Sequence, residues 1–75
     1  MRIWVVNFGF GVEHAYTSLE NAYNASWDFL LNEGYKPNDE DGGEFFEELM
    51  REYDDERYSG FEVDGVLKCW EVEVD

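Results

Sequence analysis

The sequence predicts a single α+β domain, residues 1–75, in which a small antiparallel sheet of three to four strands carries two helices on one face. Three observations predict this class. The chain opens with alternating apolar residues, continues with two segments that have apolar residues at helical spacing, and ends with two alternating segments around Asp64-Gly65. The expected order of elements is therefore β(β)ααββ.

The first segment, residues 2–12, alternates with a period of two, which is typical of a strand. The glycines at 9 and 11 favour a tight turn, after which Val12 to Tyr16 return as a second strand. One long bent strand is the alternative. One face of the first segment would carry Arg2, Trp4, Val6, Phe8, Phe10 and Val12, and the other face Ile3, Val5, Asn7, Gly9 and Gly11.

The next segment predicts a helix that begins with Thr17 as its N-cap and Glu20 closing a capping box. Gly34 follows the last turn, where a residue in the left-handed conformation is expected. The apolar stripe of this helix is Leu19, Ala22, Tyr23, Ser26, Trp27, Leu30 and Leu31.

A loop from Tyr35 to Gly43 precedes a second predicted helix, which runs from about Glu44 to Asp55. Acidic residues gather at its start, where the helix dipole favours them, and at its end, where the dipole opposes them. Its apolar face would consist of Phe45, Phe46, Leu49, Met50 and Tyr53.

The last segment predicts a hairpin of Tyr58 to Val63 and Val66 to Val74, joined by a two-residue Asp64-Gly65 turn. This turn would pair Val63 with Val66. We then expect an apolar core face and an open, acidic outer face of the sheet. The core face would carry Phe61, Val63, Val66, Trp70, Val72 and Val74, and the outer face Glu62, Leu67, Cys69, Glu71 and Glu73.

The charge of the chain is strongly unbalanced, with 19 acidic and 5 basic residues and a net charge of −14. Residues 39–64 hold twelve of the acids and two of the bases. Such a charge repels nucleic acid and anionic membranes, so we expect neither as a direct partner. It favours a basic protein, and nucleic-acid-binding enzymes are common owners of large basic surfaces.

No residue pattern predicts catalysis, a cofactor or a metal site. His14 and Cys69 are the single residues of their kinds, and neither has a catalytic partner beside it in the sequence. An EF-hand alignment that puts Gly42 at position 6 places Pro37, which has no side-chain ligand, at position 1. The lone cysteine and the short apolar start predict a protein of the reducing cytoplasm. The missing catalytic pattern predicts that the protein is not an enzyme.

Carboxylates recur every four residues along the second helix, at a spacing of about 6 Å. This spacing is of the same order as that of phosphates along a nucleic-acid strand. One interpretation is a solvated acidic face that keeps an aromatic-rich domain soluble. The other is nucleic-acid mimicry, with a partner-binding surface formed by Glu44, Glu47, Glu48, Glu52, Asp54, Asp55 and Glu56 and by the aromatic anchors Tyr53 and Tyr58.

In length and acidity the chain resembles small inhibitor proteins of phages and mobile elements. The resemblance includes two segments, Met1-Arg2-Ile3-Trp4-Val5-Val6 and Thr17-Ser18-Leu19-Glu20-Asn21-Ala22. That group contains anti-CRISPR and anti-restriction proteins, several of which are acidic DNA mimics. The resemblance implies a viral protein that inhibits a nuclease or another DNA or RNA enzyme in the host cell cytoplasm. The alternative function is a non-catalytic interaction or regulatory module of phage or bacterial origin, forming a homodimer through an exposed strand edge.

Overall fold

The computed structural model describes residues 1–9, 11–38, 40, 42–55 and 60–74 of the chain. In this part of the chain, two helices and four strands follow one another in the order ββααββ, which confirms the predicted α+β class and order of elements. The elements are β1 (Arg2–Asn7), β2 (Glu13–Tyr16), α1 (Leu19–Asn32), α2 (Gly43–Asp54), β3 (Phe61–Val63) and β4 (Leu67–Glu73).

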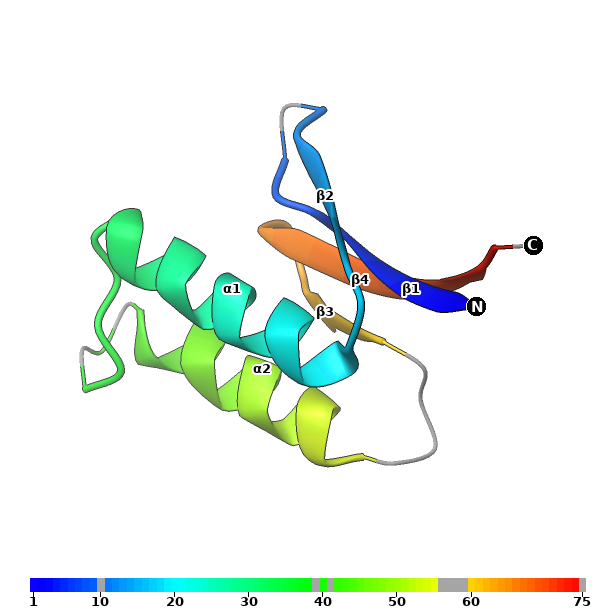
Figure 1. Cartoon of the computed structure of the whole chain (residues 1–75). Helices are drawn as coiled ribbons and strands as arrows, with labels where there is room; N and C mark the ends of the chain where they lie inside the picture. The colour runs from blue at the N-terminus through cyan, green and yellow to red at the C-terminus, as the bar shows by residue number, and fades with distance from the viewer. Residues whose placement is uncertain (10, 39, 41, 56–59, 75) are drawn as a thin grey trace.

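The strands form one antiparallel sheet with the spatial order β2-β1-β4-β3. The first and last strands of the chain therefore lie side by side in the centre of the sheet (Figure 1). The two ends of the chain are joined there by hydrogen bonds, because Val74 donates its backbone N–H to the carbonyl of Met1 at 2.7 Å. The centre of the sheet can therefore form only when β1 and β4, which are far apart in the sequence, come together.

Residues 2–16 form a hairpin and not one bent strand, since β1 pairs antiparallel with β2. Gly9 and Gly11 make the connection possible, because their φ angles of 88° and 77° are ones that residues other than glycine rarely adopt. The amide of Gly9 also donates to the Asn7 side-chain oxygen at 2.7 Å. Val6 is fully buried, so the face of β1 that carries Trp4 and Val6 is the one turned to the core. Val12, in contrast, is 48% exposed, and Phe10 lies outside the described residues.

The N-cap of α1 is Ser18 and not the predicted Thr17. Ser18 has an extended backbone, with φ −144° and ψ 153°, and its hydroxyl accepts a hydrogen bond from the amide of Asn21 at 3.0 Å. The capping box through Glu20 was therefore wrong by one residue. The C-terminal prediction is confirmed, because Gly34 has a φ of 94° and the amides of Gly34 and Tyr35 close a Schellman motif on Leu31 and Leu30.

Helix α2 begins one residue earlier than predicted, at Gly43. The loop before it passes close to this helix start, since a Cβ at Gly43 would lie 2.9 Å from the carbonyl oxygen of Pro37. A glycine at this position therefore lets the loop turn tightly into the helix.

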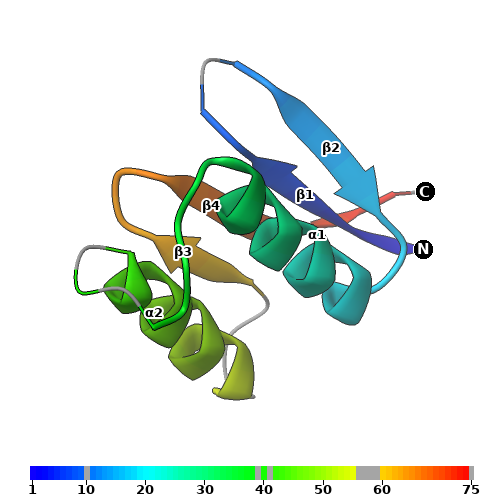
Figure 2. The same cartoon turned by 90° about the vertical axis from the view of Figure 1, so that its left-hand side faces the viewer.

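Both helices lie on the same face of the sheet (Figure 1, Figure 2). Helix α1 packs against β1 and β2, and α2 packs against β3 and α1. The buried apolar core between the two layers consists of Val6, Ala22, Leu30, Phe46, Leu49, Phe61, Val63, Leu67 and Cys69.

The register of the C-terminal hairpin differs from the prediction by one residue. Asp64-Gly65 does form the turn, with Gly65 at φ 76° and the Val66 amide donating to the Val63 carbonyl at 2.9 Å. Val66, however, is an extra residue, because the ladder partner of Val63 is Leu67. A bulge of this kind moves every later side chain to the opposite face of its strand.

This one-residue difference in register exchanges the two predicted faces of β4. Leu67 and Cys69 are buried under the helices, whereas Trp70 and Val72 point to the outer side of the sheet, contrary to the prediction. We define the open sheet face as the side away from the helices. Its members are the apolar Ile3, Val5, Ala15, Trp70 and Val72 and the polar Asn7, Glu13, Glu62 and Lys68. The prediction of an acidic outer face was therefore wrong, because the centre of this face is apolar.

Candidate functional site

The acidic residues of α2 lie on the side of the helix that faces away from the core. Phe46 and Leu49 are buried, while Glu44, Glu47 and Asp54 are exposed. Glu48, Glu52 and Asp55 flank this face and are half-buried. The helical repeat thus separates the apolar and acidic residues of this segment into two faces of one helix.

The carboxylates form two rows along α2, since successive residues are rotated by about 100°. Glu44, Glu48 and Glu52, four residues apart, make one row, and Glu47 and Asp54, seven apart, make the other. Arg51 lies between the rows. Among the described residues, Arg2 and Glu71 form an ion pair at 3.0 Å, and none of these five α2 carboxylates has such a partner.

The acidic residues at the end of α2 oppose folding. Asp54 is the last helical residue, where the helix dipole is negative, and Asp55 is the C-cap. Arg51 is the one basic residue in this last turn. Selection for stability alone would favour the opposite charge here, so these carboxylates point to a role other than folding.

Removing the charge of Asp54 is therefore expected to stabilise the protein. We predict that Asp54→Asn raises the free energy of unfolding by about 0.3–1 kcal/mol at low ionic strength. Glu44→Gln is the matched control, because Glu44 lies in the first turn, where the dipole favours a negative charge, and its loss should lower stability. Urea unfolding at low and high salt measures both. Changes of the same sign in the two variants would contradict the dipole argument.

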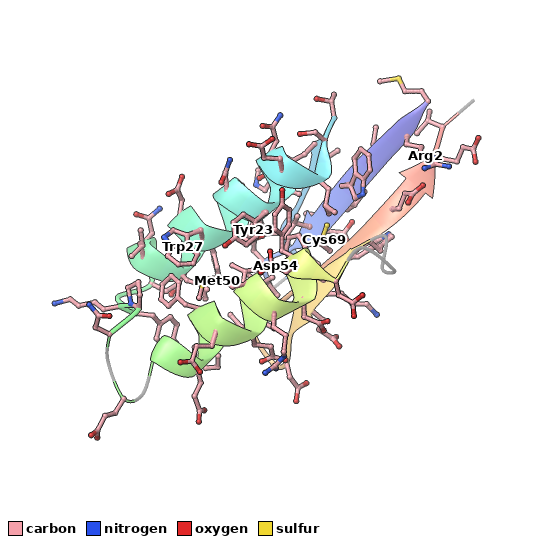
Figure 3. The ribbon with its side chains drawn as sticks, turned by 90° about the horizontal axis from the view of Figure 1, so that it is seen from below. Arg2, Tyr23, Trp27, Met50, Asp54 and Cys69 are labelled. Atoms are coloured by element: carbon pink, nitrogen blue, oxygen red, sulfur yellow. The ribbon has the colours of Figure 1, made fainter. Side chains whose placement is uncertain are left out.

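Beside the acidic face, large side chains that remain partly accessible pack between the two helices. We call Tyr23, Trp27, Met50 and Tyr53 the interhelix seam. Tyr23 stacks on Tyr53 with ring centroids 4.1 Å apart and planes at 26°, and lies 6.2 Å from Trp27. Figure 3, which looks at the helices from below, shows Tyr23, Trp27 and Met50 between the two helices, with Asp54 close to Tyr23.

The seam and the carboxylates are electrostatically coupled. Burial raises the pKa of Tyr23, and the nearby negative charge of Asp54 raises it further. Met50 is 39% exposed, and the three rings of the seam are half-buried, so a partner can still cover part of them. Aromatic rings bordered by charged residues are the usual composition of an energetically important protein contact.

Sequence reasoning assigned Tyr23 and Trp27 to the core and did not include them in the binding surface. A usable signal was the width of the apolar stripe. Only three of its positions, Ala22, Ser26 and Leu30, are fully buried, and Leu31 is 43% exposed. A stripe wider than one buried face indicates that part of it remains at the surface.

Of the two predicted aromatic anchors, Tyr53 and Tyr58, the structure describes only Tyr53. Tyr53 is part of the seam, where it stacks on Tyr23 and is half-buried, so its ring does not project freely. Tyr58 and Glu56 lie outside the described residues. The six other predicted contact residues all belong to α2 or to its C-cap.

A second concave region lies between α1 and the β1–β2 hairpin, with a volume of about 800 Å³. Phe8 and Phe29 form its apolar floor, with ring centroids 4.8 Å apart, and His14 borders it 5.8 Å from Phe8. Within the described part of the chain, no three His, Cys, Asp or Glu side chains are grouped so that they could hold a metal ion. None of the helices described there is long and apolar enough to cross a membrane.

Cys69 is 4% exposed and lies in the core of the domain. Burial raises the pKa of its thiol to about 12, while a backbone hydrogen bond from Phe61 acts in the opposite direction. The thiol therefore stays protonated at neutral pH, and a protonated thiol is a weak nucleophile. Cys69 accordingly acts as a small apolar core residue.

The geometry defines a two-layer α+β protein with an acidic helix and an aromatic seam on one side. Comparisons with protein-family models, with curated proteins and with solved structures found no match. Function is therefore argued from the surfaces alone.

Proposed function

We propose that this chain is an acidic inhibitor that binds the basic nucleic-acid-binding surface of a nuclease or another DNA or RNA enzyme, and so excludes the nucleic acid. One observation supports this proposal above the others. The carboxylates Glu44, Glu47, Glu48, Glu52 and Asp54 lie on one helix without an ion-pair partner among the described residues.

Such carboxylates are available to a basic partner without first breaking an intramolecular ion pair. The combined electrostatic field of these carboxylates speeds the encounter with a positively charged groove. It also favours the orientation in which α2 faces that groove. Because the helix holds them at intervals of about 6 Å, several can contact the basic side chains of one groove at once.

The interhelix seam would supply the apolar part of the contact. Charge pairs at the rim of an interface contribute little to affinity, whereas well-packed aromatic residues contribute most. Trp27 lies against Phe46 with ring centroids 4.6 Å apart, so its position is set before the partner arrives. A preorganised ring loses little conformational entropy on binding.

Charge reversal on α2 tests the proposal. The chain is immobilised, bacterial lysate is passed over it, and bound proteins are eluted with salt and assayed for binding to labelled DNA and RNA. We expect an eluted protein whose nucleic acid is displaced by the wild-type chain. Glu48→Lys with Glu52→Lys should weaken this displacement more than about tenfold, a change of about 1.4 kcal/mol.

The matched control is Glu20→Lys with Glu33→Lys, which makes the same change in net charge on exposed positions of α1 and its C-cap. Circular dichroism verifies that each variant is folded. The proposal is wrong if the α2 variant displaces nucleic acid as well as the wild type does, or if both double variants lose the same amount. The second result would show that only total charge matters.

The alternative function, a homodimer formed by pairing of strand edges, has less support. The two edge strands, β2 and β3, contain four and three residues. Short edge strands offer few unpaired backbone groups to another chain.

A further inference from the structure

The open sheet face is ordered in rows that run across the strands. One polar row at the end of the sheet consists of Glu62, Lys68, Asn7 and Glu13, one residue from each strand. The Asn7 side-chain amide donates to Glu13 within this row at 3.4 Å. The next two rows are apolar and consist of Trp70, Val5 and Ala15, and of Val72 and Ile3.

Four of the five side chains in these apolar rows lie on the two central strands, and Ala15 lies on β2. Neither α1 nor α2 covers them (Figure 1). Ile3, Val5, Trp70 and Val72 are half-buried, because neighbouring side chains on the same face shield one another. The edge strand β3 adds little cover, since Gly60 lies just before it and has no side chain. A Cβ at Gly60 would overlap the Cys69 carbonyl, so a larger residue cannot be accommodated here without a backbone shift.

The size of this face follows from the dimensions of its strands. Strands about 4.8 Å apart with about 3.3 Å per residue give four strands of this length an area on the order of 400 Å². The apolar rows occupy the centre of this area, and the polar row occupies one end of it. Two such faces in contact would bury on the order of 800 Å² in total, which corresponds to a weak association.

We propose that two copies of the chain associate through their open sheet faces, with the two sheets stacked and the four helices outermost. Stacked sheets of this kind pack about 10 Å apart with interdigitating side chains. The contact would be centred on Val5 and Trp70, the cross-strand pair in the middle of the sheet.

The charge distribution indicates why the occupant is a second copy. Among the residues that the structure describes, the open sheet face carries the charged residues Glu13, Glu62 and Lys68, a net charge of −1, while the chain as a whole has a net charge of −14. It is therefore a face on which two strongly acidic molecules can approach without bringing their acidic helices together. In the stacked pair, the two α2 helices lie on opposite outer sides, which keeps their mutual repulsion small.

This association goes beyond the inhibitory function and uses a different surface. A pair would present two acidic helices in opposite directions, and could therefore hold two basic sites at once or bind a dimeric partner more tightly than one copy does.

Salt distinguishes the two proposals. Sedimentation velocity of the full chain over an about hundredfold range of concentration should show a monomer–dimer equilibrium. Raising the salt from about 0.05 to 0.5 M should strengthen the dimer, since it screens the repulsion between acidic copies and leaves the apolar contact intact. The same change should weaken binding to a basic partner through α2, so either proposal can fail while the other stands.

Matched variants test the surface itself. Val5→Glu adds a carboxylate at the centre of the face and should abolish dimerisation. Val12→Glu is the control, because it makes the same substitution at a 48% exposed position of the β1–β2 connection. Ile3→Thr with Val72→Thr is a milder pair that retains β-branched residues and should weaken the dimer at least fivefold if Val5→Glu fails to fold.

The proposal is supported if only the variants of the open sheet face reduce association. It is overturned if the wild type is monomeric over the whole concentration and salt range. It is also overturned if a dimer persists unchanged in folded Ile3→Thr/Val72→Thr, which would place the contact at a strand edge or on the helices.

Discussion

Replacing Phe46 with alanine is expected to lower the free energy of unfolding by about 3–5 kcal/mol, which is the range for a buried phenylalanine. Phe46 is 1% exposed and is the largest of the fully buried side chains. It lies where α2 meets α1, against the ring of Trp27. Removing it would leave a cavity at the point where the two helices hold each other in place.

A domain of 75 residues has a total stability of about 4–11 kcal/mol, so this one substitution removes a large part of it. Urea unfolding followed by tryptophan fluorescence measures the loss. Met50→Ala is the matched control on the same helix, because Met50 is 39% exposed and its truncation should cost much less. Equal losses in the two variants would contradict the placement of Phe46 in the core.

Alkaline pH is expected to destabilise the protein through Cys69. The pKa of its thiol is raised by burial from 9.0 to about 12. Above pH 9 the unfolded chain gains stability by releasing the proton, whereas the folded chain keeps it until about pH 12. The stability that the protonated Cys69 thiol contributes to the folded state is therefore fully present below pH 9. It is lost as the pH rises, by on the order of 2 kcal/mol at a pH 1.5 units above the pKa of the unfolded chain.

Cys69→Ala isolates this effect. Tyr16 and Tyr23 also have raised pKa values, chiefly through burial, and so act in the same direction above pH 10. Tyr23 does so in both proteins, whereas Cys69 itself contributes to the raised pKa of Tyr16, so that contribution is lost in the variant. The stability difference between wild type and variant should shrink between pH 8 and pH 10.5. A difference that stays constant over this range would show that the thiol is not protected. Slow reaction of Cys69 with a thiol reagent at pH 8 is the parallel expectation.

The fold class and the order of elements were predictable because local patterns determine them. The hairpin turn at Asp64-Gly65 and the end of α1 at Gly34 follow from the conformational freedom of glycine, and the structure has both. Residues 2–16 were ambiguous between a hairpin and a bent strand. Pairing of β1 with β2 decided it, because pairing is a contact between distant residues.

The register of β3 on β4 could not be read from the alternating pattern. Residues 66–74 offer apolar side chains on both faces, Leu67 and Cys69 on one and Trp70 and Val72 on the other. Either face could therefore have been buried. The extra residue Val66 after the turn puts Leu67 opposite Val63 and turns the Trp70 face outward.

The acidic residues of the candidate surface were predictable from the sequence, but the aromatic residues that border them in the folded protein were not. The recurrence of glutamates every four residues places them on one side of α2, as the structure shows. Tyr23 and Trp27 come from a different helix, and only the packing of α1 on α2 brings Tyr23 beside Tyr53 and Asp54 and Trp27 against Phe46. No local pattern in α2 contains that information.

The sequence by itself determined the α+β class, the helices with their boundaries to within one residue, and the concentration of negative charge on α2, because each depends on residues close together in the chain. The tertiary structure alone decided which face of β4 is buried, that the outer face of the sheet is apolar, and that aromatic rings of α1 border the acidic helix. These features depend on strand register and helix packing, which are contacts between residues far apart in the sequence.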